Sequence, residues 1–373
     1  MKGIQIFILL IVQSWISLAQ DKNLSILFLG DVMQHQDQID NAYNADSGRY
    51  VYDSFKYVED IFKQADLTIA NLEFTMAGPP YTGYPTFCAP DDVAADMKKA
   101  GVDVFVTANN HSCDKRRKGL VRTVDVLDSL GILHTGTYKD LDDKKANFPL
   151  VLEKNGFRLG LLNYTYGTNG IPVPEGTIVD HIDLETIRKD INLVQTFHVD
   201  KVILFFHWGY EYQPNPSKQQ LEIAAACFQY GADIIIGSHP HVLQRMENRF
   251  NLQTGKDEVV VYSLGNFISH QRTIPRDGGA MFQLNLTKND STTWVESAGY
   301  YLTWVHNPHF GGGREDFFVL PASKFEQTGE VLGKQAFDKM GRFIKNSRNL
   351  LQKQNLNVFE YVFDLKAAEW TRK

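Results

Sequence analysis

The sequence predicts an α/β fold built around a mostly parallel β-sheet, and two observations support this prediction. Short, continuously apolar runs rich in Val, Ile and Phe recur along the chain, and helix start and stop signals lie between them. Strands covered on both faces have such continuous apolar runs, and strands that alternate with helices form parallel βαβ units. The runs lie at residues 25–29, 67–70, 102–107, 158–162, 201–206, 232–236 and 258–262.

The helix signals are capping residues at both ends of the segments between these runs. Ser or Asp accepts hydrogen bonds from the free N–H groups of a first turn, and Gly adopts the left-handed conformation that ends many helices. The expected helices run from Asp91 to Gly101, from Leu120 to Gly131, from Asp183 onward, and from Ser217 to Gly231.

The pattern changes after about residue 278. Residues 280–286 and 299–305 are expected to form antiparallel strands, with a second sheet as one arrangement, and residues 323–351 are expected to form a helix. No repeat or low-complexity linker marks a domain boundary. We therefore expect one domain over residues 20–373, with a core at about 24–310 and a C-terminal elaboration at about 311–373.

The composition is that of an ordinary globular protein. The 373 residues are 43% hydrophobic and 22% charged, which allows one large α/β domain or two modest ones. The formal net charge is −6. Because phosphate contacts need a basic face, this charge argues against a nucleic-acid partner.

The three cysteines, Cys88, Cys113 and Cys227, are too few for a disulfide framework. We expect three buried free thiols, with one disulfide plus a free thiol as the alternative.

The first residues have the pattern of a secretory signal. Lys2 precedes a largely apolar stretch, and the small residues Ser17 and Ala19 stand where signal peptidase cleaves. A membrane anchor is the weaker interpretation, because Gln13 interrupts the stretch before it reaches the ~20 apolar residues that a spanning helix needs. We therefore expect residues 1–19 to be a signal peptide and the mature protein to be periplasmic or extracellular.

Polar clusters follow six of the seven apolar runs. In open α/β sheets ligands bind outside the carboxyl ends of the strands, so these clusters are expected to meet at one edge. Taken singly, each side chain could be a turn, capping or core residue; taken together, they predict a metal site. Imidazole and carboxylate ligands suit Zn, Mn or Fe better than Ca or Mg. The candidate ligands are Asp31, Glu73, Asn110, His207, His239 and His241.

A pair of divalent metal ions about 3.5–4 Å apart needs a bridging carboxylate, and Glu73 is the natural candidate. His111, next to the candidate ligand Asn110, is placed to give a proton to a leaving group. His111 is therefore the predicted catalytic residue.

The clusters also carry a family resemblance. In order they read Gly-Asp at 30–31, Asn-Leu-Glu at 71–73, Ala-Asn-Asn-His at 108–111, His-Trp-Gly-Tyr-Glu-Tyr at 207–212, Gly-Ser-His-Pro-His at 237–241 and Ser-Leu-Gly-Asn-Phe at 263–267. This order resembles the CapA family of capsule and poly-γ-glutamate synthesis proteins, which is similar to the calcineurin-like metallophosphoesterases.

The resemblance implies a four-layer α/β/β/α sandwich with a dinuclear metal centre. It implies that Asp31 and His241 bind the first metal and that Glu73 bridges. It also implies that Asn110, His207 and His239 bind the second metal, and that His111 is the proton donor.

The sequence departs from the phosphoesterase pattern at Met33, where that pattern has a histidine ligand. His35, two residues further on, is an alternative ligand, but a surface histidine is expected there. Glu73 replaces the bridging Asp of the pattern. The first metal is therefore expected to lack one ligand.

Several residues have less certain roles. Glu211 and Tyr212 are expected either to take part in substrate binding or to hydrogen-bond their loop, and Asn266 to brace the site or touch substrate. Asp114 is interpreted as a helix cap, and Arg272 is a minor candidate for binding a substrate carboxylate or phosphate. The remaining histidines considered, His270, His306 and His309, are expected to be structural or surface residues.

The resemblance, together with the N-terminal signal pattern, implies an exported, metal-dependent hydrolase or transferase. Its expected partners are an anionic cell-envelope polymer or its precursor, and capsule-synthesis membrane proteins. Two alternatives stay open: a non-catalytic accessory subunit with a degenerate metal site, and amide-bond rather than phosphoester chemistry.

Overall fold

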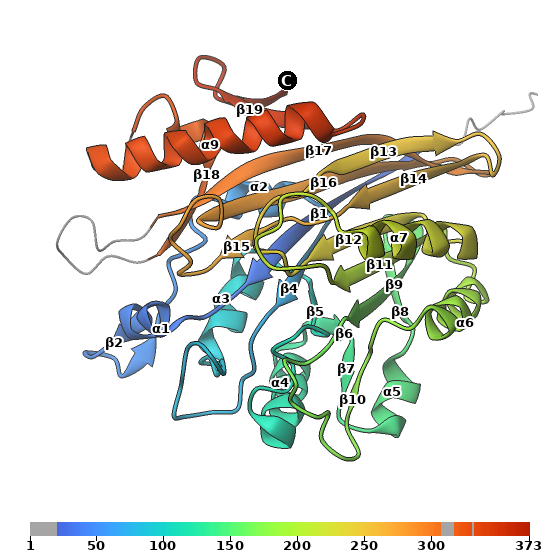
Figure 1. Cartoon of the computed structure of the whole chain (residues 1–373), viewed down its shortest axis with the longest axis horizontal. Helices are drawn as coiled ribbons and strands as arrows, with labels where there is room; N and C mark the ends of the chain where they lie inside the picture. The colour runs from blue at the N-terminus through green and yellow to red at the C-terminus, as the bar shows by residue number, and fades with distance from the viewer. Residues whose placement is uncertain (1–20, 307–316, 330–331) are drawn as a thin grey trace, which may run out of the picture.

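Two stacked β-sheets with helices on their outer faces form the described part of the chain (Figure 1). The computed structural model describes residues 21–306, 317–329 and 332–373. The predicted signal peptide, residues 1–19, and His309 lie outside these residues. Among the helices that the structure describes, none combines the length and apolar composition needed to cross a membrane.

The larger sheet is centred on β1 (Lys22–Val32), which pairs in parallel with β4 (Leu67–Leu72) and antiparallel with β16 (Gly278–Lys288). Within the described residues it has ten strands. Its order is β20 (Glu369–Arg372), β19 (Phe359–Asp364), β17 (Thr293–His306), β16, β1, β4, β5 (Val104–Val106) and β6 (Leu133–Thr135), with β15 (Asn266–Ile268) beside β1 and β18 (Phe318–Pro321) beside β17.

The smaller sheet contains the remaining long apolar runs. Four parallel strands form its centre, and each edge adds one antiparallel strand. Its order is β13 (Met246–Asn251), β14 (Lys256–Val261), β12 (Ile234–Ser238), β11 (Lys201–His207), β9 (Phe157–Thr165) and β8 (Leu150–Lys154). All seven predicted runs are therefore in strands, but they are divided between two sheets.

The main core lies between the sheets because successive side chains of a strand point to opposite faces. In β1, Ile26 and Phe28 face the smaller sheet, whereas Leu27 and Leu29 face the outer helices. In β11, Phe205 faces the larger sheet. Continuously apolar runs thus supply two apolar faces at once.

Helices cover both outer faces. The larger sheet packs on α2, α3 and α4, and the smaller sheet packs on α6 and α7. These layers confirm the predicted four-layer α/β/β/α sandwich. The helices are α1 (Gln36–Ala42), α2 (Glu59–Gln64), α3 (Asp92–Ala100), α4 (Arg116–Leu130), α5 (Leu141–Asn147), α6 (Leu184–Gln195), α7 (Lys218–Tyr230), α8 (Ala322–Phe325) and α9 (Lys334–Gln354).

Most predicted helix ends are confirmed. Asp183 and Ser217 accept side-chain hydrogen bonds at the starts of α6 and α7, and Gly131 ends α4 in the left-handed conformation. Asp91 precedes α3 but makes no capping bond, because its carboxylate pairs with Arg122. Helix α4 begins four residues before the predicted Leu120.

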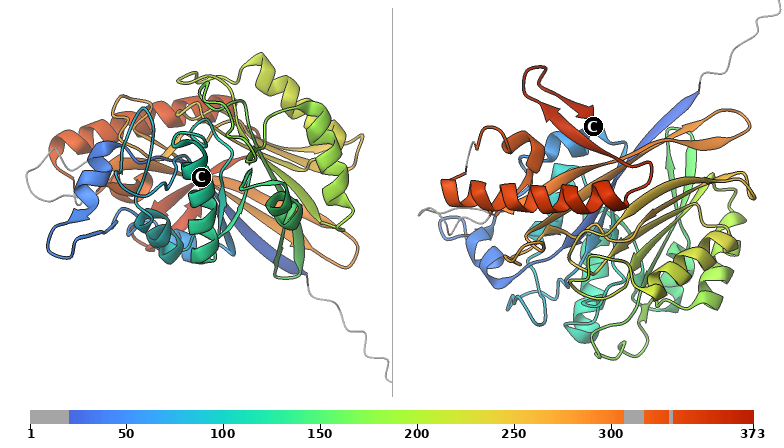
Figure 2. Two further views of the ribbon diagram at one scale, coloured as in Figure 1. Left: turned by 90° about the horizontal axis from the view of Figure 1, so that it is seen from below. Right: turned by 45° about the horizontal axis from the view of Figure 1, so that its top comes forward.

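The C-terminal part extends the larger sheet. Strands β16 and β17 are antiparallel as predicted, but they belong to the sheet of β1 rather than to a separate one. The helix predicted over 323–351 is divided into α8 and α9. Helix α9 lies along β17 and packs its apolar face against the same core that joins the two sheets (Figures 1 and 2).

Two smaller strand pairs lie outside the sheets, and the described cysteines are free. Cys88, Cys113 and Cys227 are all buried thiols, as expected. The strand pairs are β2 (Tyr43–Asn44) with β3 (Arg49–Tyr50), and β7 (Thr137–Tyr138) with β10 (Ile178–Val179).

One ion-pair network ties α9 to the larger sheet. Arg348 lies 2.6 Å from a carboxylate oxygen of Glu326, which follows α8, and 2.7 Å from one of Glu360 in β19. Glu360 is only 5% exposed. Removing the arginine would leave this carboxylate buried without its cation.

We predict that Arg348→Ala lowers the free energy of unfolding by about 2–4 kcal/mol, because breaking a buried ion pair leaves an uncompensated charge. Urea denaturation followed by circular dichroism measures the change. The matched control is Arg342→Ala, an exposed arginine of the same helix, which should change stability by less than about 0.5 kcal/mol. Equal effects of the two substitutions would contradict the prediction.

Candidate metal centre

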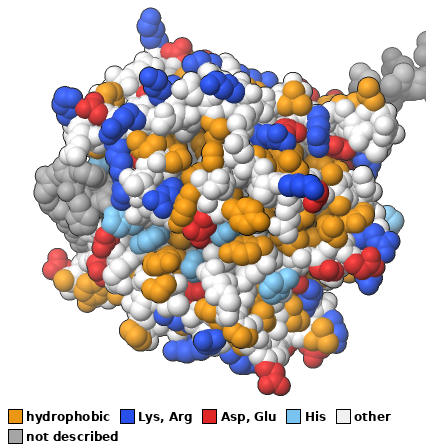
Figure 3. All heavy atoms as spheres, in the orientation of Figure 1, with side chains coloured by type: hydrophobic (Ala, Val, Ile, Leu, Met, Phe, Trp, Pro, Cys, Tyr) orange, Lys and Arg blue, Asp and Glu red, His pale blue; other side chains and the backbone are white. Residues whose placement is uncertain are grey.

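The polar clusters meet where strands of both sheets end. Asp31 is the second-last residue of β1, Glu73 follows β4, and Asn110 follows β5. From the smaller sheet, His207 is the last residue of β11, while His239 and His241 follow β12. The structure thus brings together all six predicted ligands. Figure 3 shows histidine and acidic side chains close together on one face of the molecule, among hydrophobic ones.

Asp31 is fully buried and fixed by hydrogen bonds. Its Oδ1 accepts from the Asn71 side-chain amide at 2.9 Å, and its Oδ2 lies 3.0 Å from Nδ1 of His241. The backbone N–H of His239 also donates to this carboxylate. Burial raises the pKa of Asp31, but the hydrogen bond and charge of His241 outweigh burial and hold this pKa below its ordinary value.

His207 is also fully buried, and both ring nitrogens face polar atoms. Nδ1 lies 3.0 Å from Oγ of Ser238, and Nε2 lies 2.9 Å from Oδ1 of Asn110. A partner on one ring nitrogen fixes the orientation of the other. Burial, and then the charge of His239, hold the pKa of His207 well below its ordinary value. The ring is therefore neutral, which is the form that binds metals.

His241 connects the two carboxylates. Its Nδ1 lies 3.0 Å from both Asp31 and Oδ1 of Asn266, and its Nε2 lies 3.8 Å from Oε1 of Glu73. The Asn266 amide donates in turn to the backbone carbonyl of Arg276. Of the two roles expected for Asn266, the contacts show the first: it braces a histidine of the site.

Glu73 lies between two imidazoles, and its carboxylate makes no hydrogen bond with the described residues. Its Oε1 is 3.7 Å from Nε2 of His207 and 3.8 Å from Nε2 of His241. Both carboxylate oxygens are buried and have no hydrogen-bond partner among the described residues. Burial, followed by the negative charge of Asp31, raises the pKa of Glu73 well above its ordinary value.

The donor atoms around Glu73 have the spacing and chemistry that a metal ion needs. A buried carboxylate without a partner is costly, and a cation removes that cost. Donor–metal distances of about 2.0–2.2 Å let two donors of one ion lie up to roughly 4 Å apart, which covers the separations around Glu73. Ligand atoms of Asp31, Glu73 and His207 lie within 4.8 Å of one another. The donor set therefore fits a divalent cation.

His239 is buried, and its Nδ1 has no hydrogen-bond partner among the described residues. Its ring centroid lies 4.7 Å from that of His207 and 4.5 Å from that of Tyr166. Burial, and then the charge of His241, lower the pKa of His239 to about 3. A neutral imidazole with a free nitrogen is suited to bind an ion.

His111 forms a pair with a carboxylate beside the ligands. Its Nδ1 lies 2.7 Å from Oδ2 of Asp114, and its ring packs edge-on against Phe87. Asp114 was interpreted as a helix cap, and that interpretation is wrong. Helix α4 begins after Lys115, and the Asp114 carboxylate accepts from His111 and from the backbone N–H of Phe87 instead. In the sequence, the three-residue spacing between His111 and Asp114 is the signal that could have indicated this pair.

Glu211 and Tyr212 lie on the loop after β11, at the open side of the centre. A carboxylate oxygen of Glu211 lies within 4.8 Å of ligand atoms of His239 and His241. Tyr212 places its ring 6.2 Å from that of His241. Both residues are therefore at the site.

A family model described as bacterial capsule synthesis protein PGA_cap matches residues 25–271, a range that contains every residue of this centre. The chain belongs to this family. The match begins within β1 and ends beyond β15, so it includes the smaller sheet, the strands of the larger sheet from β1 to β6 and β15, and all six segments that meet at the centre.

Two curated relatives have related names. The capsule biosynthesis protein CapA of Bacillus anthracis is 30% identical over 207 residues, which are 54% of this chain and 48% of that protein. The PGA biosynthesis protein CapA of Bacillus subtilis strain 168 is 32% identical over 197 residues, 52% of this chain and 49% of that protein. The matches span about half the length of these curated relatives.

Among solved structures, the calcineurin-like phosphoesterase YfkN from Bacillus subtilis is similar over 88% of this chain and 99% of that chain. The sequence identity is 14% and the TM-score is 0.47.

The family member described here has no histidine two residues after Asp31. Met33 is buried in the apolar cluster between the larger sheet and its helices. His35, which is expected at the surface, is half-buried: its ring centroid lies 5.2 Å from that of Phe87, and burial lowers its pKa to about 4. Its Nδ1 accepts from the backbone N–H of His270.

Arg272 does not reach the site. Its side chain is largely buried against Trp304 and donates to the backbone carbonyl of Val305. Arg276, which sequence reasoning missed, is the arginine beside the centre: its guanidinium lies 4.3 Å from the centroid of the Tyr212 ring. No signal in the sequence distinguished the two arginines.

A cavity of about 370 Å³ adjoins the ligands. Its lining includes three large aromatic side chains together with His239 and Glu211. A pocket that combines aromatic walls with a few polar groups next to a metal site is the expected place for a substrate. Its aromatic lining residues are Tyr166, Trp208 and Tyr210.

We predict opposite effects of Glu73→Gln on stability with and without metal. Without metal the variant should be more stable than the original protein by about 1–3 kcal/mol, because a buried unpaired charge is removed. With Zn²⁺ or Mn²⁺ it should gain less stability than the original protein, because ligand binding stabilises in proportion to affinity. Thermal melts with the metal ion and with a chelator measure both effects.

The control is Glu222→Gln, an exposed glutamate of α7 whose loss should leave both melts unchanged. A Glu73→Gln variant that responds to metal as strongly as the original protein would contradict the assignment of Glu73 as a ligand.

Proposed function

We propose that this chain is an exported, metal-dependent hydrolase or transferase that acts on an anionic cell-envelope polymer, or its precursor, during capsule synthesis. Family membership and the names of the two Bacillus relatives support the capsule context. The observation that carries the catalytic part is Glu73, a buried carboxylate without a hydrogen bond between two imidazoles. The N-terminal signal pattern supports export.

The proposed ligands are divided as the sequence predicted. Asp31 and His241 would hold one ion, His207, His239 and Asn110 the other, and Glu73 both. When bound, divalent ions of Zn, Mn or Fe supply Lewis-acid polarisation of substrate oxygens and a more acidic water.

His111 exchanges the proton that bond cleavage requires. Asp114 binds its Nδ1 and thereby fixes the ring, which leaves Nε2 for the substrate. A histidine that is oriented by a carboxylate in this way is suited to protonate a leaving group. Phe87 packs on the ring and limits its movement.

The position of Arg276 supports the proposal that the substrate is anionic. The chain as a whole is acidic, yet this arginine stacks on Tyr212 at the rim of the centre, and no carboxylate of the described residues is recorded within 4.0 Å of it. Thr273 accepts from its guanidinium and orients it. Guanidinium groups bind carboxylate and phosphate groups through paired hydrogen bonds.

We predict that His111→Ala lowers kcat by about 10²–10⁴-fold, because that is the usual contribution of general acid–base catalysis. Hydrolysis of p-nitrophenyl phosphate and of poly-γ-glutamate by the metal-loaded protein measures the effect, and elemental analysis should show unchanged metal content. His198→Asn, at an exposed histidine with φ of 53°, is the matched control. Unchanged turnover in His111→Ala would exclude the proposed role.

We predict that Arg276→Ala raises KM for an anionic substrate by about 10-fold or more and changes kcat less, because a charged hydrogen bond contributes about 1.5–3 kcal/mol. The measurement compares a phosphate monoester with a neutral carboxylic ester. Arg188→Ala, on the exposed face of α6, is the control. A KM increase of the same size for the neutral ester would show that the arginine has no role in binding charge.

A non-catalytic accessory subunit for polymer assembly or export is the second candidate, and Met33 favours it because it removes one ligand that the phosphoesterase pattern contains. Capsule output in cells distinguishes the two functions. Under the enzymatic proposal output is lost in His111→Ala; under the accessory proposal it survives that change and is lost on substitution of surface residues. Amide rather than phosphoester cleavage would appear as activity on poly-γ-glutamate alone.

A further inference from the structure

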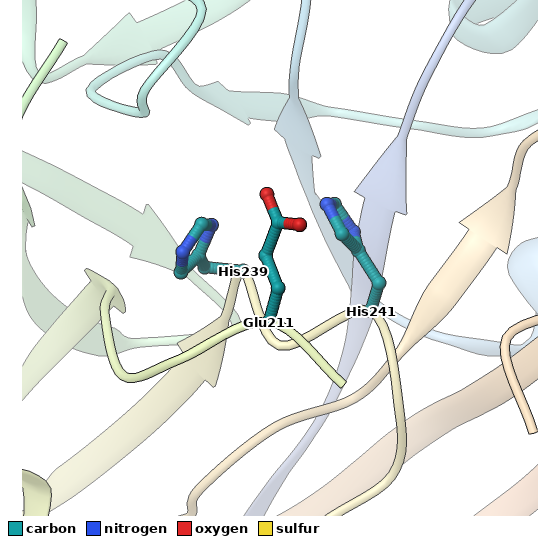
Figure 4. A group of neighbouring side chains, drawn as sticks. All are labelled: Glu211, His239 and His241. Atoms are coloured by element: carbon teal, nitrogen blue, oxygen red, sulfur yellow. The ribbon is translucent and has the colours of Figure 1, made fainter. Parts of the chain in front are cut away.

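The loop after β11 brings a third acidic side chain to the metal centre. Figure 4 shows the carboxylate of Glu211 between the imidazoles of His239 and His241. One oxygen of Glu211 and one ring nitrogen of each histidine all lie within 4.8 Å of one another. Three possible donors thus converge from two loops that follow neighbouring strands.

The two histidines are buried, and His239 has a ring nitrogen that is available to bind a metal ion. His239 is 3% exposed, and its Nδ1 has no hydrogen-bond partner among the described residues. Buried polar atoms in folded proteins nearly always have a partner, and those without one need an explanation such as an ion. A cation at this centre supplies that explanation.

The backbone holds these residues in uncommon conformations. His239, His241 and Tyr212 have φ values of 97°, 56° and 65°, in the region that favours glycine. The Tyr212 N–H donates to the carbonyl of Pro240 at 2.8 Å, so the two loops are joined directly. Non-glycine residues in this region cost of order 1–3 kcal/mol each and cluster at functional sites.

Tyr212, the residue after Glu211, packs beside the centre. Its ring centroid lies 6.2 Å from that of His241, and Arg276 lies over its ring at 4.3 Å. These contacts keep the loop that carries Glu211 next to the histidines.

We propose that Glu211 is a metal ligand and would join Asp31 and His241 in holding the first ion, beside His239 of the second ion. Carboxylates and imidazoles are donors that catalytic zinc sites use, with a further position open to water or substrate. The inference rests on the proposed function and deepens it. Since Met33 supplies no ligand, Glu211 restores the number of ligands, and it does so from the side of the substrate cavity.

The test is metal binding by the folded, full-length protein. Zn²⁺ and Mn²⁺ are titrated calorimetrically into the original protein, Glu211→Gln, Glu211→Ala and the control Glu153→Gln, an exposed glutamate of β8. Elemental analysis after dialysis gives the stoichiometry, and circular dichroism checks folding. Because Glu211 is exposed, its variants are expected to fold.

We expect two ions per chain in the original protein and in Glu153→Gln. Both Glu211 variants should bind one ion with unchanged affinity and the other at least tenfold more weakly. Affinities within twofold of the original protein for both ions would overturn the inference, as would an original protein that binds no metal. Two tightly bound ions without activity on any ester or polymer would sink the hydrolase function and leave Glu211 as a ligand.

Discussion

The fully buried carboxylate of Glu73 imposes the constraint on which the rest of the centre depends. It lies within 4 Å of two imidazoles, but neither of its oxygens has a hydrogen-bond partner in the described part of the chain. A buried carboxylate is stabilised by a positive charge beside it or becomes protonated. Burial and the charge of Asp31 raise the pKa of Glu73, and the neutral ring of His207 supplies no positive charge, so a bound cation would stabilise the ionised carboxylate.

The fold satisfies this constraint by placing strand ends from two sheets against each other. Asp31 and Glu73 arrive on β1 and β4 of the larger sheet, and the imidazoles of His207 and His241 arrive from the smaller one. The parallel pairing of β1 with β4 and of β11 with β12 fixes the separation of these side chains. The acidic ligands thus come from one layer and the histidines from the other.

The sequence was sufficient to predict this convergence because continuous apolar runs followed by polar clusters have one common explanation in α/β proteins. It predicted the strands, the caps of α6 and α7, and the free cysteines for the same reason: each rests on local chemistry. What it did not show depends on tertiary contacts. Asp114 binds His111 instead of capping α4, and only the fold places Arg276 rather than Arg272 beside Tyr212.

The origin of the ligands has a consequence for how the protein matures. A centre that takes side chains from positions 31 to 241 and from both sheets exists only after the sandwich has closed. Any metal uptake would therefore follow closure of the sandwich, and the ions present where the chain folds would decide which metal it acquires. For a protein that crosses a membrane unfolded, the destination compartment rather than the cytoplasm would select the cofactor.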